Sequence, residues 1–252
     1  MGTSTKEWVM GMTRGHIYVA FGKEYDMQAA HSALAARRFS SLPILVLTNR
    51  SEKERSDIWA KVTKVSFRRF KLPDKENRDI KTKAVYYTPF DQTLFTDTDT
   101  VIQSSQFLKS FELLNSCDIA FSIDRIFQIG GKVLRLYREA MNMFSINLPL
   151  VVYQGGVFVF KKNAPVEQLF SLWNTYWDKF GRGREMMCLA CAAKNIEGVA
   201  IGTLSKDYGH LRSHIIQHFV GGNAVKTPLL PCIKKSKQFD KKYGPGRWDW
   251  VD

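Results

Sequence analysis

The segment "TLFTDTDTV" at residues 93–101 places two carboxylates, Asp97 and Asp99, one residue apart at the end of an apolar run. Side chains at positions i and i+2 of an extended strand point to the same face, so both carboxylates would face one cation while Thr98 points away. Two like charges this close raise each other's pKa unless a cation compensates them. Magnesium and manganese ions bind such carboxylates together with substrate phosphates. The pair therefore predicts a divalent metal site for a phosphorylated ligand, with a solvated Asp-Thr-Asp turn as the alternative.

Short apolar runs that alternate with helical patterns must position these carboxylates. Strands are expected at residues 16–22, 43–49, 64–70, 93–97, 118–124 and 151–162, and residues 198–204 and 214–223 are expected to form short strands and loops. Helices are expected at residues 26–39, 78–88, 105–115, 164–177 and 184–195. This alternation predicts an α/β fold with a mostly parallel sheet, in which ligands gather beyond the carboxyl ends of the strands. Residues 125–150 break the alternation, and we expect them to form an insertion over the sheet edge.

The composition is that of a globular protein. The chain has 252 residues, 44% of them hydrophobic, and no low-complexity linker, which predicts a single domain over residues 1–252. No apolar run is long enough to span a membrane, and the first residues lack the apolar stretch of a signal peptide, so we expect a cytoplasmic protein. Four scattered cysteines argue against a disulfide scaffold. Cys188 and Cys191 lie in one helical stretch without a second cysteine pair, and we expect them to pack in the core.

The net charge of +13 predicts attraction to polyanions. Nucleic acid, an anionic membrane surface and a nucleoside diphosphate all satisfy this condition. The basic tail at residues 234–248 contains one acid among its charges and is the expected docking surface, whereas the basic stretch at residues 50–83 is interspersed with acids.

The order and spacing of these runs resemble those of nucleotide-sugar transferases of the GT-A fold. The resemblance covers the whole chain and is closest to the family-8-like and related enzymes with a DXD motif. It implies a single GT-A-type domain with a Rossmann-like, mostly parallel central sheet flanked by helices. Residues 1–115 would form the nucleotide-sugar-binding half, and residues 116–252 the acceptor-side half with the basic tail.

The resemblance also implies roles on the donor side of the site. Asp97 and Asp99 match the pair that binds the metal and the donor diphosphate. The end of the first strand, which lies beside the nucleobase in these families, matches Ala20, Phe21 and Gly22. A basic residue on the helix before the motif contacts the donor, and the candidates are Arg78, Lys81 and Lys83. The glycine pair Gly155-Gly156 resembles the small residues that let backbone approach the donor sugar, and it also fits a β-bulge.

A late motif of these families supplies a third metal ligand and a phosphate-binding lysine. His218 and Lys226 match it approximately, although Lys226 lies two residues further on than the motif requires; His214 is the alternative histidine. An Asp-Gln pair that starts the next helix in many relatives is replaced here by Glu185 and Met186, which leaves retention or inversion of the sugar configuration open.

An inverting enzyme needs a base within hydrogen-bond reach of the acceptor hydroxyl. Asp124, at the end of the fifth expected strand, and Glu185 are the candidates. Either residue could instead be a cap or a sugar-binding group.

The leading hypothesis is a glycosyltransferase that uses Mn²⁺ or Mg²⁺ and a nucleoside diphosphate sugar, with a UDP-sugar favoured. The acceptor hydroxyl would belong to an anionic or polymeric molecule: a glycan, a nucleic acid or a lipid-linked substrate at a membrane surface. The first alternative is a nucleic-acid-binding protein that uses the basic tail. The second is a haloacid-dehalogenase-like phosphohydrolase with Asp97 as nucleophile, although such enzymes usually carry this residue on their first strand.

Overall fold

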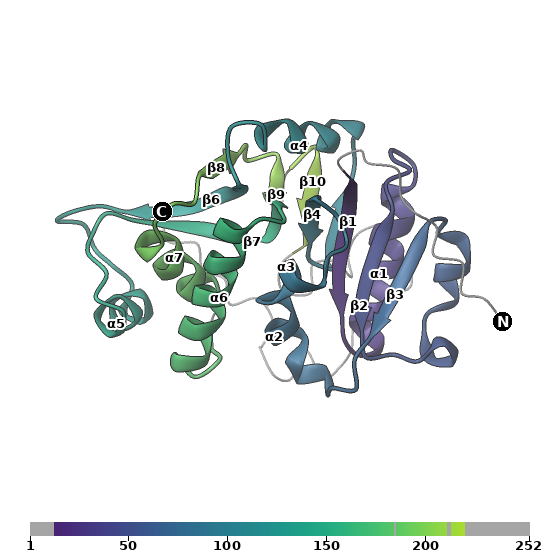
Figure 1. Ribbon diagram of the computed structural model, residues 1–252, viewed down its shortest axis with the longest axis horizontal. Helices are drawn as coiled ribbons and strands as arrows, with labels where there is room; N and C mark the ends of the chain where they lie inside the picture. The colour runs from purple at the N-terminus through teal and green to yellow at the C-terminus, as the bar shows by residue number, and fades with distance from the viewer. Residues whose placement is uncertain (1–12, 184, 211–212, 220–252) are drawn as a thin grey trace.

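The computed structural model describes residues 13–183, 185–210 and 213–219, whose strands form a seven-stranded and a three-stranded sheet (Figure 1). The strands of the large sheet are, in spatial order, β3 (Val65–Arg69), β2 (Ile44–Thr48), β1 (Arg14–Ala20), β4 (Gln92–Thr96), β7 (Leu150–Lys161), β6 (Ile119–Phe127) and β8 (Ile201–Leu204). Every neighbouring pair is parallel except the two that involve β7. The expected α/β class with a mostly parallel sheet is confirmed.

Helices cover both faces of this sheet. They are α1 (Lys23–Ala36), α2 (Asn77–Lys81), α3 (Ala84–Tyr87), α4 (Ser110–Leu113), α5 (Arg135–Met143), α6 (Ala164–Lys179) and α7 (Glu185–Asn195). Short 3-10 turns lie at η1 (Glu52–Glu54), η2 (Asp57–Lys61), η3 (Asp74–Glu76) and η4 (Ser105–Lys109). Within the described residues, no helix is long and apolar enough to cross a membrane.

Alternate residues of β1 separate the two layers. Ile17 and Val19 belong to a core shared with α2, α3, α6 and α7, whereas Tyr18 and Ala20 pack with α1 and η2. In Figure 1, α6 lies in front of the sheet and α1 behind it. Both faces of β1 are covered, and this explains why residues 17–21 form a continuous apolar run.

Helix α6 fixes β7 beside β4. Asn163 caps its N-terminus by accepting a hydrogen bond from Val166 N at 3.1 Å. The five residues that share its apolar face are all buried: Val166, Leu169, Phe170, Trp173 and Trp177. Below them, Phe158 of β7 stacks on Phe95 of β4 with ring centroids 4.6 Å apart. The packing of α6 therefore holds the end of β4, where the carboxylate pair begins, against β7.

The small sheet was not expected as a unit. Its strands are β5 (Thr100–Ile102), β10 (Ile216–His218) and β9 (Tyr208–His210), with β10 in the middle. Strand β5 follows the carboxylate pair directly and pairs antiparallel with β10. The small sheet therefore brings a late segment of the chain next to the end of β4.

Residues 125–150 are only partly the separate insertion that the sequence suggested. Strand β6 runs on to Phe127, β7 begins at Leu150, and these two residues are partners in the register. Helix α5 lies between them. We call residues 125–149 the β6–β7 excursion; it projects from one end of the molecule (Figure 1). The expected helix at residues 105–115 is also divided, into η4 and α4.

Candidate active site

A tight turn after β4 brings Asp97 and Asp99 together. Strand β4 ends at Thr96, and Thr98 and Asp99 form a turn before β5, so the expectation of one extended strand through both carboxylates is wrong. Asp97 N donates a hydrogen bond to Gly156 O at 2.7 Å, and Thr100 Oγ1 donates one to Asp97 O at 2.8 Å. Thr98 points away from the pair, as expected, and donates a hydrogen bond to Gln28 Oε1 at 2.9 Å.

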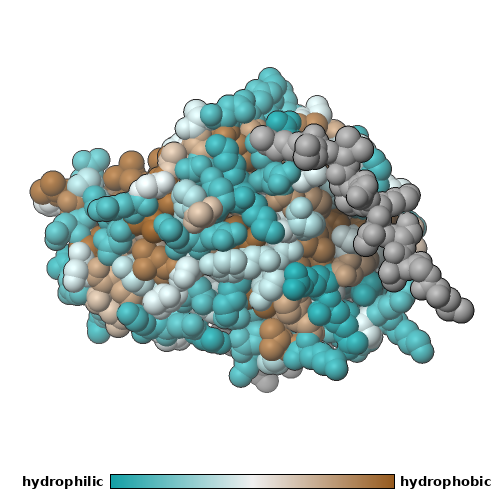
Figure 2. All heavy atoms as spheres, viewed as in Figure 1, coloured by the Kyte–Doolittle hydropathy of each residue, from teal (hydrophilic) through white to brown (hydrophobic). Residues whose placement is uncertain are grey.

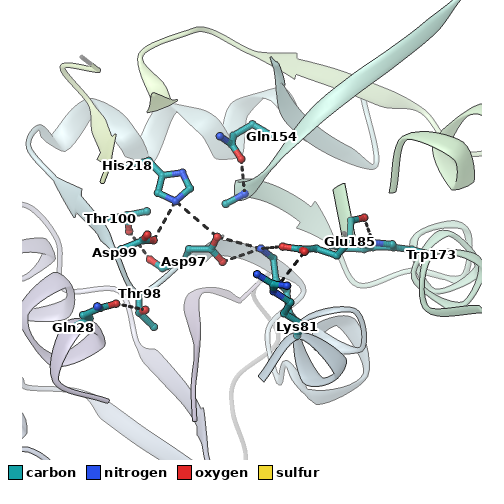
Figure 3. A network of polar contacts seen from close by, with 12 residues as sticks. Gln28, Lys81, Asp97, Thr98, Asp99, Thr100, Gln154, Trp173, Glu185 and His218 are labelled. Atoms are coloured by element: carbon teal, nitrogen blue, oxygen red, sulfur yellow. Dashed lines mark hydrogen bonds and ion pairs between the residues drawn. The ribbon is translucent and has the colours of Figure 1, made fainter. Parts of the chain in front are cut away.

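His218 completes the cluster from the small sheet. It pairs with Thr100 across the β10–β5 ladder, and Phe219 N donates a hydrogen bond to Asp99 O at 2.9 Å. Its Nε2 atom lies 3.1 Å from Asp99 Oδ1 and 3.9 Å from Asp97 Oδ2 (Figure 3). Ligand atoms of the three side chains all lie within 4.8 Å of one another, a spacing that could hold one metal ion.

Gly156 leaves the space that this arrangement requires. A Cβ atom at this position would lie 2.4 Å from His218 Cε1, 2.7 Å from His218 Nδ1 and 3.0 Å from Asp97 Oδ2. The register between β6 and β7 also shifts here, because Phe121 pairs with Phe158 and the next residue pairs with Gln154. The glycine pair thus lies at a β-bulge, and at Gly156 the bulge lies directly against the three-residue cluster.

Two basic residues from α2 lie on the other side of Asp97. Lys81 Nζ is 2.9 Å and 3.1 Å from the two carboxylate oxygens of Asp97 and 3.6 Å from Glu185 Oε1. Arg78 Nε is 3.6 Å from Glu185 Oε2. Figure 3 shows the chain of ion pairs running from His218 through Asp97 and Lys81 to Glu185. Of the three basic candidates on this segment, Lys81 contacts the cluster directly through Asp97, and Arg78 is linked to it through Glu185.

Burial and charge shift the pKa values of this network. Burial raises the pKa of Asp97 and the charge of Asp99 adds to it, although Lys81 and His218 act in the opposite direction. Burial disfavours the charged forms of Lys81 and His218, but the neighbouring carboxylates outweigh it and raise the pKa of both. Burial also opposes ionisation of Glu185, yet Lys81 and Arg78 hold its pKa below the usual range. The carboxylates of the cluster are thus balanced by cationic side chains.

The donor set fits a divalent metal ion. Two carboxylates and one imidazole are ligands that Mn²⁺ accepts, and carboxylates alone suit Mg²⁺. A bound dication would supply the positive charge that Asp97 and Asp99 require. Asp97, Asp99 and His218 would hold it, and the contact of Lys81 with Asp97 would fix the orientation of that carboxylate.

Two amide side chains that were not predicted as site residues border the end of β1. Phe21 N donates a hydrogen bond to Asn77 Oδ1 at 2.9 Å, and Gly22 N donates one to Asn49 Oδ1 at 2.8 Å. Gly22 has φ of 87°, and a Cβ atom there would lie 2.6 Å from Asp74 Oδ2. Asn49 directly follows β2, so the rule that polar residues at strand ends gather at one edge could have found it.

Several expected site residues lie elsewhere or outside the described part of the chain. Lys83 Nζ contacts both carboxylate oxygens of Asp79 at 2.9 Å and, among the described residues, forms no hydrogen bond or ion pair with the three-residue cluster. Asp124 accepts a hydrogen bond from Arg125 Nε at 2.6 Å. His214 is exposed and takes no part in the three-residue cluster. Lys226 and the basic tail at residues 234–248 lie outside the described residues.

The cysteine pair belongs to the core. Cys188 and Cys191 are buried on α7, and burial raises the pKa of each thiol to about 12. Protonated buried thiols of this kind are poor nucleophiles.

The fold is that of known glycosyltransferases. No family model matches the chain, and no curated protein matches it in sequence. Among solved structures, the galactosyltransferase LgtC in complex with donor and acceptor sugar analogs is similar, with a TM-score of 0.62, 12% identity and coverage of 90% of this chain and 99% of that one. The bifunctional glycosyltransferase WbbM has a TM-score of 0.55 and 15% identity, covering 80% of this chain and 40% of that one. Mouse xyloside xylosyltransferase 1 has a TM-score of 0.51 and 12% identity, covering 78% and 86%. The chain thus has the GT-A fold.

Proposed function

We propose that this protein is a metal-dependent glycosyltransferase that moves a sugar from a nucleoside diphosphate sugar to an acceptor hydroxyl. The observation that carries the proposal is the cluster of Asp97, Asp99 and His218 at the end of β4, on a fold shared with glycosyltransferases. A UDP-sugar is the favoured donor, and an anionic or polymeric molecule is the favoured acceptor. The cytoplasmic location remains a prediction from the sequence.

The cluster would act on the leaving group. Asp97, Asp99 and His218 would hold Mn²⁺ or Mg²⁺, which supplies positive charge to the diphosphate as the bond to the sugar breaks. Lys81 lies beside Asp97 and Arg78 lies beside Glu185, and from there they would contact the donor phosphates or sugar. Lys226 remains a proposed phosphate ligand on the resemblance alone.

The surrounding backbone would position the rest of the donor. Ala20, Phe21 and Gly22 end β1, and the amides that Asn49 and Asn77 bind fix this edge for a nucleobase. Gly155 and Gly156 would let the donor sugar approach β7. In this arrangement residues 1–115 form most of the nucleotide-sugar-binding half, and the acceptor-side half at residues 116–252 also contributes His218, Gly155 and Gly156 to the donor site.

Both candidate bases pair with cationic side chains, Asp124 with Arg125 and Glu185 with two basic residues of α2. Glu185 faces Lys81 and Arg78, and its lowered pKa makes it a poor proton acceptor. We therefore assign Glu185 the task of holding these cations in place. Asp124 is the base that we propose for an inverting reaction.

A donor screen tests this function without knowledge of the acceptor. The protein is incubated with Mn²⁺ and a panel of nucleoside diphosphate sugars, and release of nucleoside diphosphate by slow hydrolysis is measured. We expect release from a UDP-sugar, its loss in Asp99→Asn, and its retention in Asp57→Asn, which changes an exposed carboxylate on η2. No metal-dependent release from any donor would contradict the proposal.

The other two functions gain no support. Among the described residues β4 is the fourth strand, whereas the phosphohydrolase nucleophile usually lies on the first. The basic tail that motivated nucleic-acid binding lies outside the described residues. A stable phosphoaspartate analogue at Asp97 would support the phosphohydrolase hypothesis. We expect that no such adduct forms.

A further inference from the structure

Exposed apolar side chains gather on the β6–β7 excursion. Eight large hydrophobic residues are exposed among the described residues, and five of them belong to this segment: Ile126, Ile129, Leu134, Leu136 and Met143. Ile129 is 79% exposed. Figure 2 shows hydrophobic residues at the surface of this end of the molecule. Single exposed apolar residues are ordinary, but a cluster of them at one projecting segment indicates a binding surface.

The five residues are not exposed because the excursion has moved away from the rest of the protein. The excursion has its own core, in which Phe127, Ala140, Met141 and Phe144 pack with residues of α7. Leu136 and Met143 are seven residues apart, so they lie on the same side of α5, outside this core. The apolar surface is therefore present while the excursion is fully folded against α7.

Basic residues accompany the apolar ones. Residues 125–143 contain four basic side chains, Arg125, Lys132, Arg135 and Arg138, and one acidic side chain, Glu139. Arg125 is paired with Asp124, and Arg135 with Glu139. Lys132 and Arg138 form no ion pair with any residue that the structure describes. The segment thus presents aliphatic side chains together with cations that have no acidic partner there.

This combination suits an anionic lipid bilayer. Aliphatic side chains enter the boundary between headgroups and acyl chains, while Lys and Arg bind anionic headgroups. Single-stranded nucleic acid would instead be bound by aromatic side chains on which bases stack, and none of the five exposed residues is aromatic.

We propose that the β6–β7 excursion docks the protein on the surface of an anionic membrane. Ile129, Leu134 and Leu136 insert into the interface, and Lys132 and Arg138 contact the headgroups. Strand β6 runs parallel to β4 in the sheet, so the excursion leaves from the same edge as the metal cluster. Helix α7, on which the excursion packs, begins at Glu185 in the candidate site. A docked molecule would hold its acceptor side close to the lipid surface.

Sedimentation with vesicles tests the docking surface independently of the transferase proposal, because no donor is present. The full chain is mixed with vesicles of phosphatidylcholine, or of phosphatidylcholine with phosphatidylglycerol, and the bound fraction is measured. We expect binding to the anionic vesicles and little to the neutral ones. The double variant Ile129→Ser/Leu136→Ser should reduce the partition coefficient about tenfold, since two aliphatic side chains no longer enter the interface.

A charge variant and a matched control complete the test. Lys132→Glu/Arg138→Glu should lose binding to anionic vesicles by a similar factor. Leu72→Ser removes an exposed aliphatic residue outside the excursion and should bind as the wild type does. All three changes are at exposed positions, so unfolding midpoints should stay at the wild-type value.

Three results would overturn the proposal. Undiminished vesicle binding by both excursion variants would assign membrane contact to another surface, such as the basic tail. Equal binding to neutral and anionic vesicles would remove the role of the cations. In the third result, the wild type binds no vesicles and instead forms a dimer or a nucleic-acid complex that the Ile129→Ser/Leu136→Ser variant abolishes. The surface would then be a binding site for a second copy of the chain or for nucleic acid.

Discussion

Asp97 lies in an environment where a carboxylate is stable only with a cation beside it. Burial and the neighbouring Asp99 raise its pKa, and Lys81 and His218 are the groups that favour its charged form. Lys81 is itself almost fully buried and also faces Glu185. Removing one partner of a buried ion pair leaves an uncompensated buried charge. The free-energy cost of that charge is larger than the net stabilisation that the intact pair provides. Lys81 therefore stabilises the folded protein in the metal-free state and orients the carboxylate that would bind a metal.

If Lys81 is replaced by a neutral residue, a bound metal ion should take over its role of compensating the charge of Asp97. We expect Lys81→Met to lower the free energy of unfolding by about 3 kcal/mol without metal, because Asp97 and Glu185 lose their buried partner. Mn²⁺ should recover part of this loss, so the metal stabilises the variant more than the wild type. Urea unfolding with and without Mn²⁺ measures both effects. Lys83→Met is the control: Lys83 pairs with Asp79, and a metal effect as large there as in Lys81→Met would refute the argument.

At the scale of elements, the bulge in β7 provides the space for the imidazole of His218. We expect Gly156→Ala to reduce Mn²⁺ affinity at least about tenfold, because the new methyl group displaces the ring or the Asp97 carboxylate. Gly155→Ala is a close control, since its Cβ would make ordinary contacts at 3.6 Å with Met186 Cγ and 3.8 Å with Lys81 Nζ. Titration of free Mn²⁺ by electron paramagnetic resonance distinguishes the two variants. Equal affinities would show that the bulge does not shape the cluster.

The pairing of β1 with β4 makes stability depend on pH. Burial lowers the pKa of His16 to about 3, with the charge of Arg37 acting in the same direction, and the ring is hydrogen-bonded to Thr96 Oγ1 at 2.8 Å. In the unfolded chain His16 takes up a proton near pH 6.5, whereas in the folded protein it stays neutral until about pH 3. Its contribution is thus complete above pH 6.5 and is lost as the pH falls. We expect a loss of about 2 kcal/mol between pH 7 and 5.

Urea unfolding across this pH range, compared with His16→Gln, isolates the contribution of His16. The variant has no group that titrates at this position, so its stability should fall less steeply toward acid pH. Parallel pH profiles for the two proteins would mean that other groups cause the loss.

At the scale of the whole molecule, the sequence was sufficient to predict the strands of the large sheet. It was not sufficient to predict the small sheet. Residues 43–49 form a continuous apolar run, and a strand buried on both faces produces that pattern locally. Strands β5 and β10 have three residues each, and a short strand was expected only in the segment that contains β10; no local pattern indicates that the two pair with one another. His218 was proposed through a resemblance, and its meeting with Asp99 depends on that pairing.

The basic residues of α2 and of the turn that follows it show a second limit of prediction from the sequence. Lys81 and Lys83 are two positions apart, so on a helical segment they point in different directions, and only packing decides which one enters the site. The sequence could name both but could not choose. Asn77, in contrast, carried no signal, because its role depends on the close approach of α2 to the end of β1.

The central claim is that Asp97, Asp99 and His218 share a divalent ion that binds a nucleoside diphosphate. Calorimetric titration of UDP into the wild type and Asp99→Ala, each with and without Mn²⁺, tests it most directly, with Asp57→Ala as the control. We expect the wild type and the control to bind UDP tightly only with Mn²⁺. Affinity in Asp99→Ala should fall about a hundredfold, since a direct ligand is lost. UDP binding of equal strength in all three proteins, with or without Mn²⁺, would contradict the account.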